Sequence, residues 1–471
     1  MRTRAALRDA GEHALTLNAL GQAEEYFRHA LVLTEEDDPE RSRLLLQYGR
    51  VRYLRELQGV DELIEAREGL SAAGDRDGAA EASLMLADIA WQGGSRDGMV
   101  QELEAARRLV EGGSRSRPQV AVLAEVARYA MLGDDLHEAI ELGREALALA
   151  AELGLDDLKA HALNTIGVCR GDLGDRGGFD DLEESIEIAS RGNFVSDLLR
   201  GHNNRQALYF LYGDIAKARS AENVTLEMAR HYGQQAFVRF VEVGPAVGNR
   251  YLAGEWDDAL ERAEAILAQA EAGARFYSTG AMYCFRGLIR LARGDEEGAA
   301  SDAERAIELA REIRDPQALH PDMSMATLLL QSSGNEQRAD ETLSEALAGL
   351  RELRRFGFAA NDLPSLAWVA VTRGRESELI ELVERESFVS PWLSATAAVL
   401  GRDFRATAEI FAEMGSPTHD AFYRLRAAEQ LVAEGRRAEA DEQLRPALAF
   451  YRSVGATRYV REGEALLAAS A

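Results

Sequence analysis

The sequence predicts an all-α protein, a right-handed α-solenoid (superhelix) in which helical hairpins stack in one continuous array. Proline makes up only 9 of 471 residues, about 2% against a usual figure of about 5%, and scarce proline favours long helices. Glycines recur about every 40 residues after apolar stretches. Pairs of alanines seven residues apart follow several of these glycines, which places each pair on one helix face.

The glycine period is the strongest of these signals. Successive marker glycines are separated by 35, 39, 41, 39, 41, 40, 40 and 40 residues. A fixed period between 20 and 50 residues is typical of repeat proteins. At this spacing, residues 1–456 hold about 11–12 hairpins. The marker glycines are Gly59, Gly94, Gly133, Gly174, Gly213, Gly254, Gly294, Gly334 and Gly374.

Each period has the same internal order. A first helix ends near the glycine, which suits a left-handed C-terminal cap, and polar residues then begin the second helix. In the second helix, Ala299 and Ala306 are followed by the larger Ile307. Small residues there let paired helices approach closely, while neighbouring hairpins cover the remaining apolar surface.

Four segments depart from this regularity. Residues 111–119 (EGGSRSRPQ) are the most loop-like and predict a flexible joint. Pro245 stands where a first helix is expected, which predicts a kink or a late helix start. Residues 374–401 form a shortened step of 27 residues that contains Pro391. The final segment, 457–471, is expected to be a C-terminal capping helix.

The repeat grammar resembles the tetratricopeptide repeat. The best match is Tyr283-Cys284-Phe285-Arg286-Gly287, followed by Gly294, Ala299 and Ala306. Gly287, Gly294 and Ala299 match the family's small positions in both helices. The family period is 34 residues, so a period near 40 implies longer helices or longer connections between repeats.

The two ends of the chain and one central stretch carry a more specific resemblance. Residues 4–15 (RAALRDAGEHAL), 162–167 (ALNTIG) and 449–467 (AFYRSVGATRYVREGEALL) resemble the C-terminal repeat region of bacterial multidomain signalling proteins. Those proteins carry a class III adenylate/guanylate cyclase domain followed by an AAA-like or STAND-type ATPase. The resemblance implies a regulatory module of such a protein, with the upstream domains among its partners.

The sequence indicates no catalytic, cofactor or metal site. A phosphate-binding loop needs a glycine-rich turn followed by lysine and Ser or Thr, but the two lysines, Lys159 and Lys217, are each followed by alanine. Cys169 and Cys284 lie far apart, which favours two small buried side chains over a disulfide or a metal site. We therefore expect a protein that is not an enzyme.

Charge and hydropathy limit the partners. With 54 basic and 80 acidic residues, the formal net charge is −26, which argues against sequence-independent nucleic-acid binding and against attraction to anionic membranes. The apolar run near the N-terminus is too short for a signal peptide, and no stretch is long enough for a membrane helix. We expect a cytoplasmic location.

The first helices should line a concave groove, which is the candidate binding surface. Counting back from the marker glycines places His161 and Asn164 there in one repeat, with Arg200 and Asn203 in the next. Related repeats hold peptide carboxylates with such residues through charge-assisted hydrogen bonds. The full set of groove candidates is His161, Asn164, Arg200, Asn203, Arg239, Arg250 and Tyr251.

Two functions remain open for this groove. The first is binding of a partner protein or peptide, for which an open groove with basic and asparagine residues is expected. The alternative is sensing of a small-molecule effector, for which a closed pocket with aromatic and polar walls is expected. In either case Arg200 should be a groove residue whose charge reversal leaves stability nearly unchanged.

Overall fold

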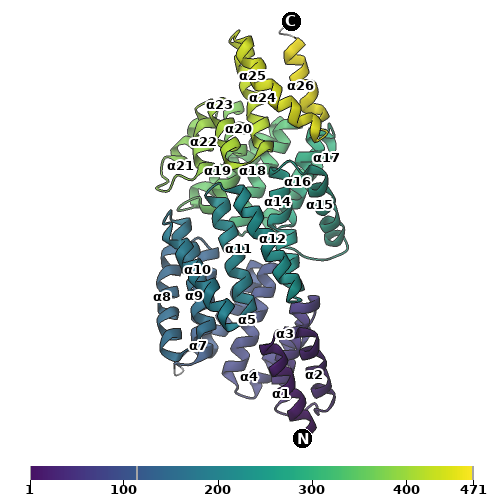
Figure 1. Ribbon diagram of the computed structural model, residues 1–471, viewed down its shortest axis with the longest axis vertical. Helices are drawn as coiled ribbons and strands as arrows, with labels where there is room; N and C mark the ends of the chain where they lie inside the picture. The colour runs from purple at the N-terminus through teal and green to yellow at the C-terminus, as the bar shows by residue number, and fades with distance from the viewer. Residues whose placement is uncertain (1, 113–114, 469–471) are drawn as a thin grey trace. The chain divides into compact units, whose positions relative to one another are not determined.

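A computed structural model of the chain describes residues 2–112 and 115–468 (Figure 1). Over these residues the structure consists of α-helices and one 3₁₀ segment, with no strand. The predicted fold class is therefore confirmed, an all-α array of helical hairpins. Residues 113–114 of the predicted joint and 469–471 of the predicted cap lie outside the described residues.

The helices group into two compact units. Unit 1 comprises Met1–Gln206 and Ala221–Val241, and unit 2 comprises Ala207–Ser220 and Glu242–Ala471, so α11, α12 and α13 each contribute to both. In unit 1 the helices are α1 (Arg2–Thr16), α2 (Leu20–Val32), α3 (Arg41–Glu56), α4 (Val60–Ala72), α5 (Arg76–Gln92), α6 (Arg96–Val110), α7 (Arg117–Leu132), α8 (Leu136–Leu153), α9 (Asp156–Asp172), α10 (Gly177–Gly192) and parts of α11 (Val195–Leu211), α12 (Ile215–His231) and α13 (Gln235–Val243).

Unit 2 continues the same alternation of first and second helices. It contains α14 (Pro245–Leu252), α15 (Trp256–Glu271), α16 (Thr279–Ala292), α17 (Glu296–Ile313), α18 (Pro316–Ser332), α19 (Glu336–Glu352), the 3₁₀ segment η1 (Gly357–Asp362), α20 (Leu363–Arg373), α21 (Glu376–Val383), α22 (Pro391–Leu400), α23 (Phe404–Met414), α24 (Pro417–Ala433), α25 (Arg437–Ser453) and α26 (Thr457–Ala468).

The marker glycines end the first helices of the hairpins. Eight of the nine have φ between 67° and 96°, a conformation that costs other residues energy because of their Cβ atom. Gly133 is the exception: its φ is −85°, and the next residue, Asp134, adopts φ 68° instead. In α7, the left-handed residue of the turn is therefore Asp134, one residue after the marker glycine.

Two irregularities in the order of the helices occur at prolines. The helix expected around Pro245 is divided into α13 and α14 at Gly244, and Pro245 is the first residue of α14. Pro391 likewise begins α22, after the eight-residue α21. A first-turn proline is tolerated because its missing N–H has no intrahelical acceptor there.

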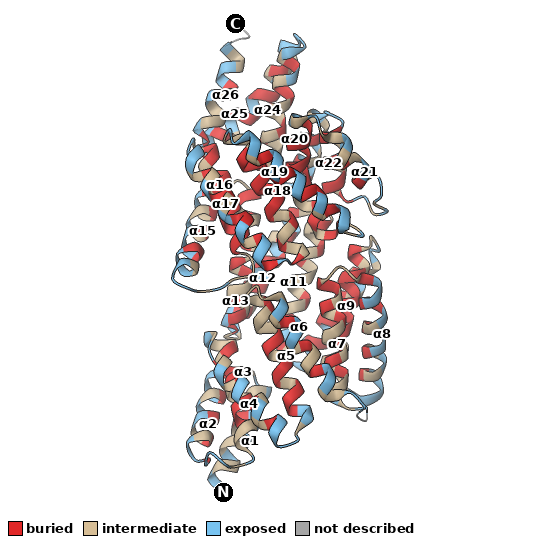
Figure 2. Ribbon diagram, turned by 180° about the vertical axis from the view of Figure 1, so that it is seen from behind, coloured by how far each residue is buried: buried red, intermediate tan, exposed pale blue. Residues whose placement is uncertain are grey.

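The buried apolar residues are organised differently in the two units. In unit 2 they form one continuous cluster that extends from Ile215 to Ala456. In unit 1 several smaller clusters are present, for example around Phe27, Leu63 and Val238. Figure 2 shows the buried faces of the helices turned toward neighbouring helices, while second helices such as α8 expose their outer faces.

In each unit, hydrogen bonds also join residues that are far apart in the sequence. In unit 2 the indole N–H of Trp256 donates to Thr418 Oγ1 at 3.1 Å, and the Thr457 hydroxyl donates to the Arg293 carbonyl at 2.9 Å. These partners are 162 and 164 residues apart, about four periods of 40. In unit 1 the Asn18 side chain donates to the Asn193 carbonyl, and the Asn193 side chain donates to the Thr16 carbonyl, both at 3.1 Å.

No helix within the described residues has the length and apolar character needed to cross a membrane. Cys169 and Cys284 are both buried and are not joined by a disulfide.

Candidate functional site

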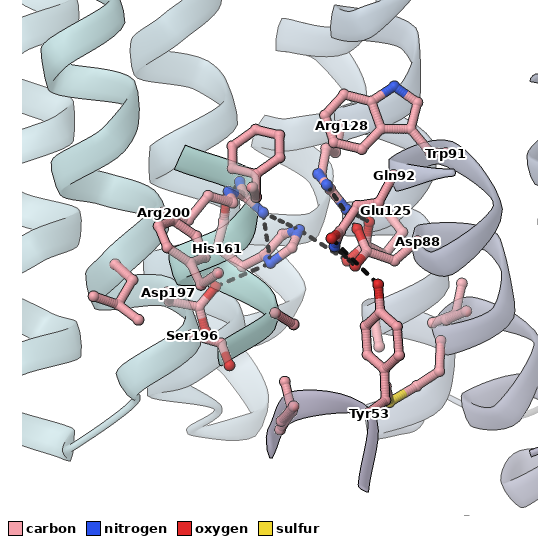
Figure 3. Close-up of a pocket in the computed structure, with 18 of the residues that line it drawn as sticks. Tyr53, Asp88, Trp91, Gln92, Glu125, Arg128, His161, Ser196, Asp197 and Arg200 are labelled. Atoms are coloured by element: carbon pink, nitrogen blue, oxygen red, sulfur yellow. Dashed lines mark hydrogen bonds and ion pairs between the residues drawn. The ribbon is translucent and has the colours of Figure 1, made fainter. Parts of the chain in front are cut away.

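Unit 1 contains a cavity of about 400 Å³, which we call the inner pocket (Figure 3). Its walls come from the first helices of consecutive hairpins, α3, α5, α7, α9, α11 and α13. This is the surface that the sequence assigns to ligand binding. The lining side chains used below are Tyr53, Asp88, Trp91, Gln92, Glu125, Arg128, His161, Asp197, Arg200, Asn203, Asn204, Phe237 and Phe240.

Helical spacing brings these side chains to one side of each helix. Glu125 and Arg128 are three residues apart on α7, as are Asp197 and Arg200 on α11. Residues three or four apart on an α-helix lie on the same face, one turn above the other. Because each first helix presents this face inward, single turns of several helices build the polar wall of the pocket.

Arg128 is the centre of the first charged group. It pairs with Asp88 at 2.9 Å and with Glu125 at 3.1 Å, and its guanidinium lies 5.4 Å from the ring centre of Trp91. Burial opposes the charge of Arg128, but Glu125, Tyr129 and Asp88 outweigh it and hold its pKa well above the usual value. Burial would likewise raise the pKa of Glu125, but Arg128, His161 and Arg200 lower it. Both groups therefore stay charged inside the protein.

A polar chain extends from this group across the pocket. Gln92 donates to Asp88 at 2.6 Å and accepts from the Tyr53 hydroxyl at 3.2 Å. Trp91 contacts Phe240 of α13 with ring centres 5.8 Å apart, and Phe240 contacts Phe237 at 5.9 Å. The pocket thus has polar groups on α5, α7, α9 and α11 and aromatic rings on α5 and α13.

His161 and Arg200 form the second group, and Figure 3 shows them facing each other. Nδ1 of His161 lies 3.1 Å from Asp197, and its Nε2 lies 3.5 Å from Glu125. Nη1 of Arg200 lies 2.8 Å from His161 Nε2, while Nη2 donates to the His161 carbonyl and to the Thr165 hydroxyl, both at 2.9 Å. Burial and the nearby Arg128 lower the pKa of Arg200 to about 10.

Arg200 lines the inner pocket, as the sequence predicts for a groove residue, and its guanidinium also makes hydrogen bonds within the fold. It donates to Asn164 Oδ1, the His161 carbonyl and the Thr165 hydroxyl. Reversing its charge would remove these donors and add a negative charge near Asp197. Loss of buried hydrogen bonds costs stability, so we expect charge reversal at Arg200 to be destabilising, whereas the sequence alone predicts little effect.

The amide side chains lie partly behind the pocket. Asn164 is fully buried and accepts from Arg200 at 3.1 Å and from Asn204 at 2.6 Å. It therefore positions pocket residues and does not line the pocket itself. Asn203 does line it, as the sequence predicts, and is joined by Asn204.

Three predicted residues lie elsewhere. Arg239 is on α13 near Tyr53, but it is not among the lining residues, unlike Phe237 and Phe240 on the same helix. Arg250 and Tyr251 belong to unit 2. There Arg250 pairs with Asp258, and Tyr251 is buried and stacks on Trp256 at 5.7 Å.

Sequence reasoning missed Asp88, Trp91, Glu125 and Arg128. Asp88 lies six residues before Gly94, and Arg128 lies six residues before Asp134, the left-handed residue of its turn. Counting back from the turn could therefore have identified Asp88 and Arg128, at a position two helical turns closer to the end of the helix than His161. In α7 this count is displaced by one residue, because Asp134 and not Gly133 is the left-handed residue of the turn.

No group of three or more His, Cys, Asp or Glu side chains is placed to hold a metal ion among the residues that the structure describes. The inner pocket instead offers charge-assisted hydrogen bonds and aromatic surface, which suit non-covalent recognition of a polar ligand.

No protein-family model matches the chain, and no curated protein matches it in sequence. Among solved structures, the chain is similar to a Rap protein complexed with competence and sporulation factor, with 12% identity over 82% of this chain and 100% of that chain and a TM-score of 0.42. It is similar to the Rap conjugation gene regulator of the plasmid pLS20 in complex with a Phr peptide, with 14% identity, 80% and 98% coverage and a TM-score of 0.44.

A third similar structure is a STAND protein with a tetratricopeptide repeat sensor from Pyrococcus horikoshii. The identity is 13%, the TM-score is 0.31, and the match covers 80% of this chain and 54% of that one. The chain therefore spans about half the length of that STAND protein.

Proposed function

We propose that this chain is a non-catalytic regulatory module that binds a peptide, or a peptide segment of a partner protein, in the inner pocket. The observation that carries the proposal is the composition of the pocket walls. Six consecutive first helices contribute to one cavity, and its lining combines charged and amide groups with aromatic rings. Main-chain amides need hydrogen-bond partners when they are buried, and apolar side chains need aromatic or aliphatic surface, so this pairing suits a polypeptide.

The proposal includes the biological setting implied by the sequence resemblance. In a cytoplasmic bacterial signalling protein, the repeats would bias an upstream ATPase or cyclase domain toward or away from activity. A ligand changes such an equilibrium when it binds the two states with different affinities. The upstream domains of the same protein are then the partner whose activity depends on whether the pocket is occupied.

The alternative, a small-molecule effector sensor, is favoured by the size of the cavity. A volume of about 400 Å³ falls near the lower end of the roughly 300–1,000 Å³ range of small-ligand pockets. Both functions use the same walls, so the ligand must be identified directly.

The test is affinity capture from a randomised decapeptide library with the full chain, followed by mass spectrometry of the retained peptides. In the variant Ala121→Trp, a large ring fills the inner pocket from α7, where Ala121 is a lining residue. The matched control, Ala151→Trp, adds the same ring at an exposed position of α8. We expect the wild type and the control to retain a common set of peptides that Ala121→Trp loses, while circular dichroism shows all three folded.

Equal retention by Ala121→Trp would contradict peptide binding in this pocket. Isothermal titration against a metabolite panel then tests the alternative. Tight one-to-one binding of a metabolite that Ala121→Trp abolishes and Ala151→Trp preserves would replace the peptide by a small effector.

A further inference from the structure

Two charged residues of the inner pocket, Arg200 and Asp197, differ in their pairing from the other charged residues around it. Three of its four lining arginines pair with carboxylates: Arg50 with Glu81 at 3.5 Å, Arg117 with Asp157 at 3.0 Å, and Arg128 with Asp88 and Glu125 at 2.9 and 3.1 Å. Buried charges are costly unless they are paired in this way. These three cations are therefore neutralised within the fold.

Arg200 differs from them. Among the described residues it makes no ion pair within 4 Å, and its partners are the Asn164 amide, the Thr165 hydroxyl, and the ring and carbonyl of His161. Asp197, one helical turn earlier on α11, faces the Nδ1 atom of the same imidazole at 3.1 Å and keeps 18% of its side chain exposed. A guanidinium and a carboxylate thus share one imidazole and do not pair with each other.

The group carries charges of both signs. Counting Asp157, the partner of Arg117, five carboxylates at 81, 88, 125, 157 and 197 surround the four arginines at 50, 117, 128 and 200. Repulsion between like charges is strong at short range, where little water screens it. A ligand that carries one charge of each sign adds no net charge to this group and still supplies a counter-ion to Arg200 and to Asp197.

We infer that the inner pocket takes a zwitterion, a short peptide with both termini free, whose carboxylate faces Arg200 and whose ammonium group faces Asp197. The apolar side chains of the ligand lie against Trp91, Phe237 and Phe240. Hydrogen bonds between charged groups are about twice as strong as neutral ones, so these two contacts determine specificity. The inference rests on the proposed function and specifies the kind of peptide that the pocket accepts.

The probe is a pool of tripeptides with randomised positions, prepared in four forms: with free ends, N-acetylated, C-amidated, and blocked at both ends. Native mass spectrometry of the full chain measures the bound fraction and gives the mass of each ligand. A mixture of free amino acids, the second source of the same chemistry, is measured in parallel. We expect the free-ended peptides to bind, and we expect blocking either end to weaken binding at least tenfold.

Two variants separate the two contacts. Arg200→Gln removes the cation but keeps a hydrogen-bonding side chain, so the preference for a free carboxylate over an amide should disappear while the preference for a free amine remains. Asp197→Asn should have the opposite effect. Arg144→Gln, at an exposed position of α8, should change neither preference. If Arg200→Gln fails to fold by circular dichroism, the Asp197→Asn variant still tests the inference.

The outcomes distinguish this inference from the proposed function. Binding that is insensitive to blocking of either end overturns the zwitterion and leaves peptide binding intact. Sensitivity to amidation alone overturns it in favour of a simple anion. Absence of bound peptide in every form overturns it together with the proposed function, and free amino acids as the bound species keep the zwitterion but overturn the peptide.

Discussion

Unit 1 and unit 2 use the same hairpins but fill the space between the first helices differently. In unit 1 the inner positions carry residues such as Asp88, Glu125 and Arg128, and a pocket is present. In unit 2 they carry aromatic residues such as Tyr423, which is 1% exposed and stacks on Phe411 at 5.6 Å. Unit 2 also has a cavity, of about 550 Å³, but fewer residues line it, among them Trp368, Arg426 and Glu429. The period of the chain therefore sets the architecture, while a few inward positions decide how the space between the first helices is filled.

The largest expected effect tests the closed core of unit 2. Trp392 is 1% exposed, contacts Phe210 with ring centres 4.9 Å apart, and donates its indole N–H to the Phe210 carbonyl at 2.8 Å. We expect Trp392→Ala to lower the free energy of unfolding by about 3–5 kcal/mol, through the cavity that it leaves. Urea unfolding followed by circular dichroism measures this, and a loss below about 1 kcal/mol would mean that unit 2 is no better packed than unit 1.

The next variant tests the polar centre of unit 1. We expect Arg200→Glu to cost about 1–3 kcal/mol, because Asn164, His161 and Thr165 lose their hydrogen bonds from the guanidinium. Arg144→Glu, on the exposed face of α8, should stay within about 0.5 kcal/mol of the wild type. Equal urea midpoints for the two variants would restore the view that Arg200 has no structural role.

Overpacking shows whether the units differ within their hairpins as well. Ala139 in unit 1 and Ala299 in unit 2 are both 0% exposed on second helices. Leucine at either position should cost about 1–3 kcal/mol, because added methylenes strain a close helix contact. Similar decreases in melting temperature for the two variants would mean that the units differ only at the inner positions. A decrease for one variant alone would mean that the packing within the hairpins differs as well.

The two units should also respond to pH in opposite directions. Burial raises the pKa of Asp362 in unit 2 to about 7, so between about pH 4 and pH 7 the unfolded chain releases a proton that the folded chain retains. Stability from this group is lost as pH rises through that window. Asp362→Asn removes the loss, so we expect the stability of the variant relative to the wild type to rise through this window, by about 1.4 kcal/mol for each pH unit.

In unit 1 the sign is reversed, because Arg128 lowers the pKa of Glu125. Its contribution is present above the unfolded-state pKa and is lost as pH falls through the folded-state value. Urea titrations from about pH 2 to about pH 8 measure both effects, because the loss from Glu125 occurs below about pH 4.5. A pH slope unchanged by Asp362→Asn would show that Asp362 is not protonated in the folded protein.

The smallest expected effect concerns the contact between the α1–α2 turn and the α10–α11 turn in unit 1. Asn18 has φ 55°, so glycine at this position keeps the backbone conformation while removing the side-chain hydrogen bond. We expect Asn18→Gly to cost about 0.5–1 kcal/mol, because the bond is exposed to water. Hydrogen exchange in the α10–α11 turn should increase, and an unchanged rate there would mean that the contact does not hold the two turns together.

The hairpin array could be predicted because its determinants are local. A left-handed turn favours glycine, and a close helix contact favours alanine, so both recur with the period. His161, Arg200 and Asn203 were found because α9 and α11 keep the register set by Gly174 and Gly213.

Arg250 and Tyr251 do not line the inner pocket, because they belong to unit 2, after the break at Gly244. The division between the units also depends on contacts made across about 160 residues, which no local pattern contains. The pairing of Arg128 with Asp88, 40 residues earlier, is likewise set by the stacking of hairpins and not by either helix alone.

The long-range contacts of unit 2 also restrict how the protein can evolve. Repeat proteins commonly gain or lose a repeat, because each repeat touches only its neighbours. Here Trp256 meets Thr418 and Arg293 meets Thr457, so insertion of one hairpin between the partners would move every such pair out of register by 40 residues. The number of hairpins between those partners is therefore fixed by the fold, and related chains should differ by substitutions and loop changes there.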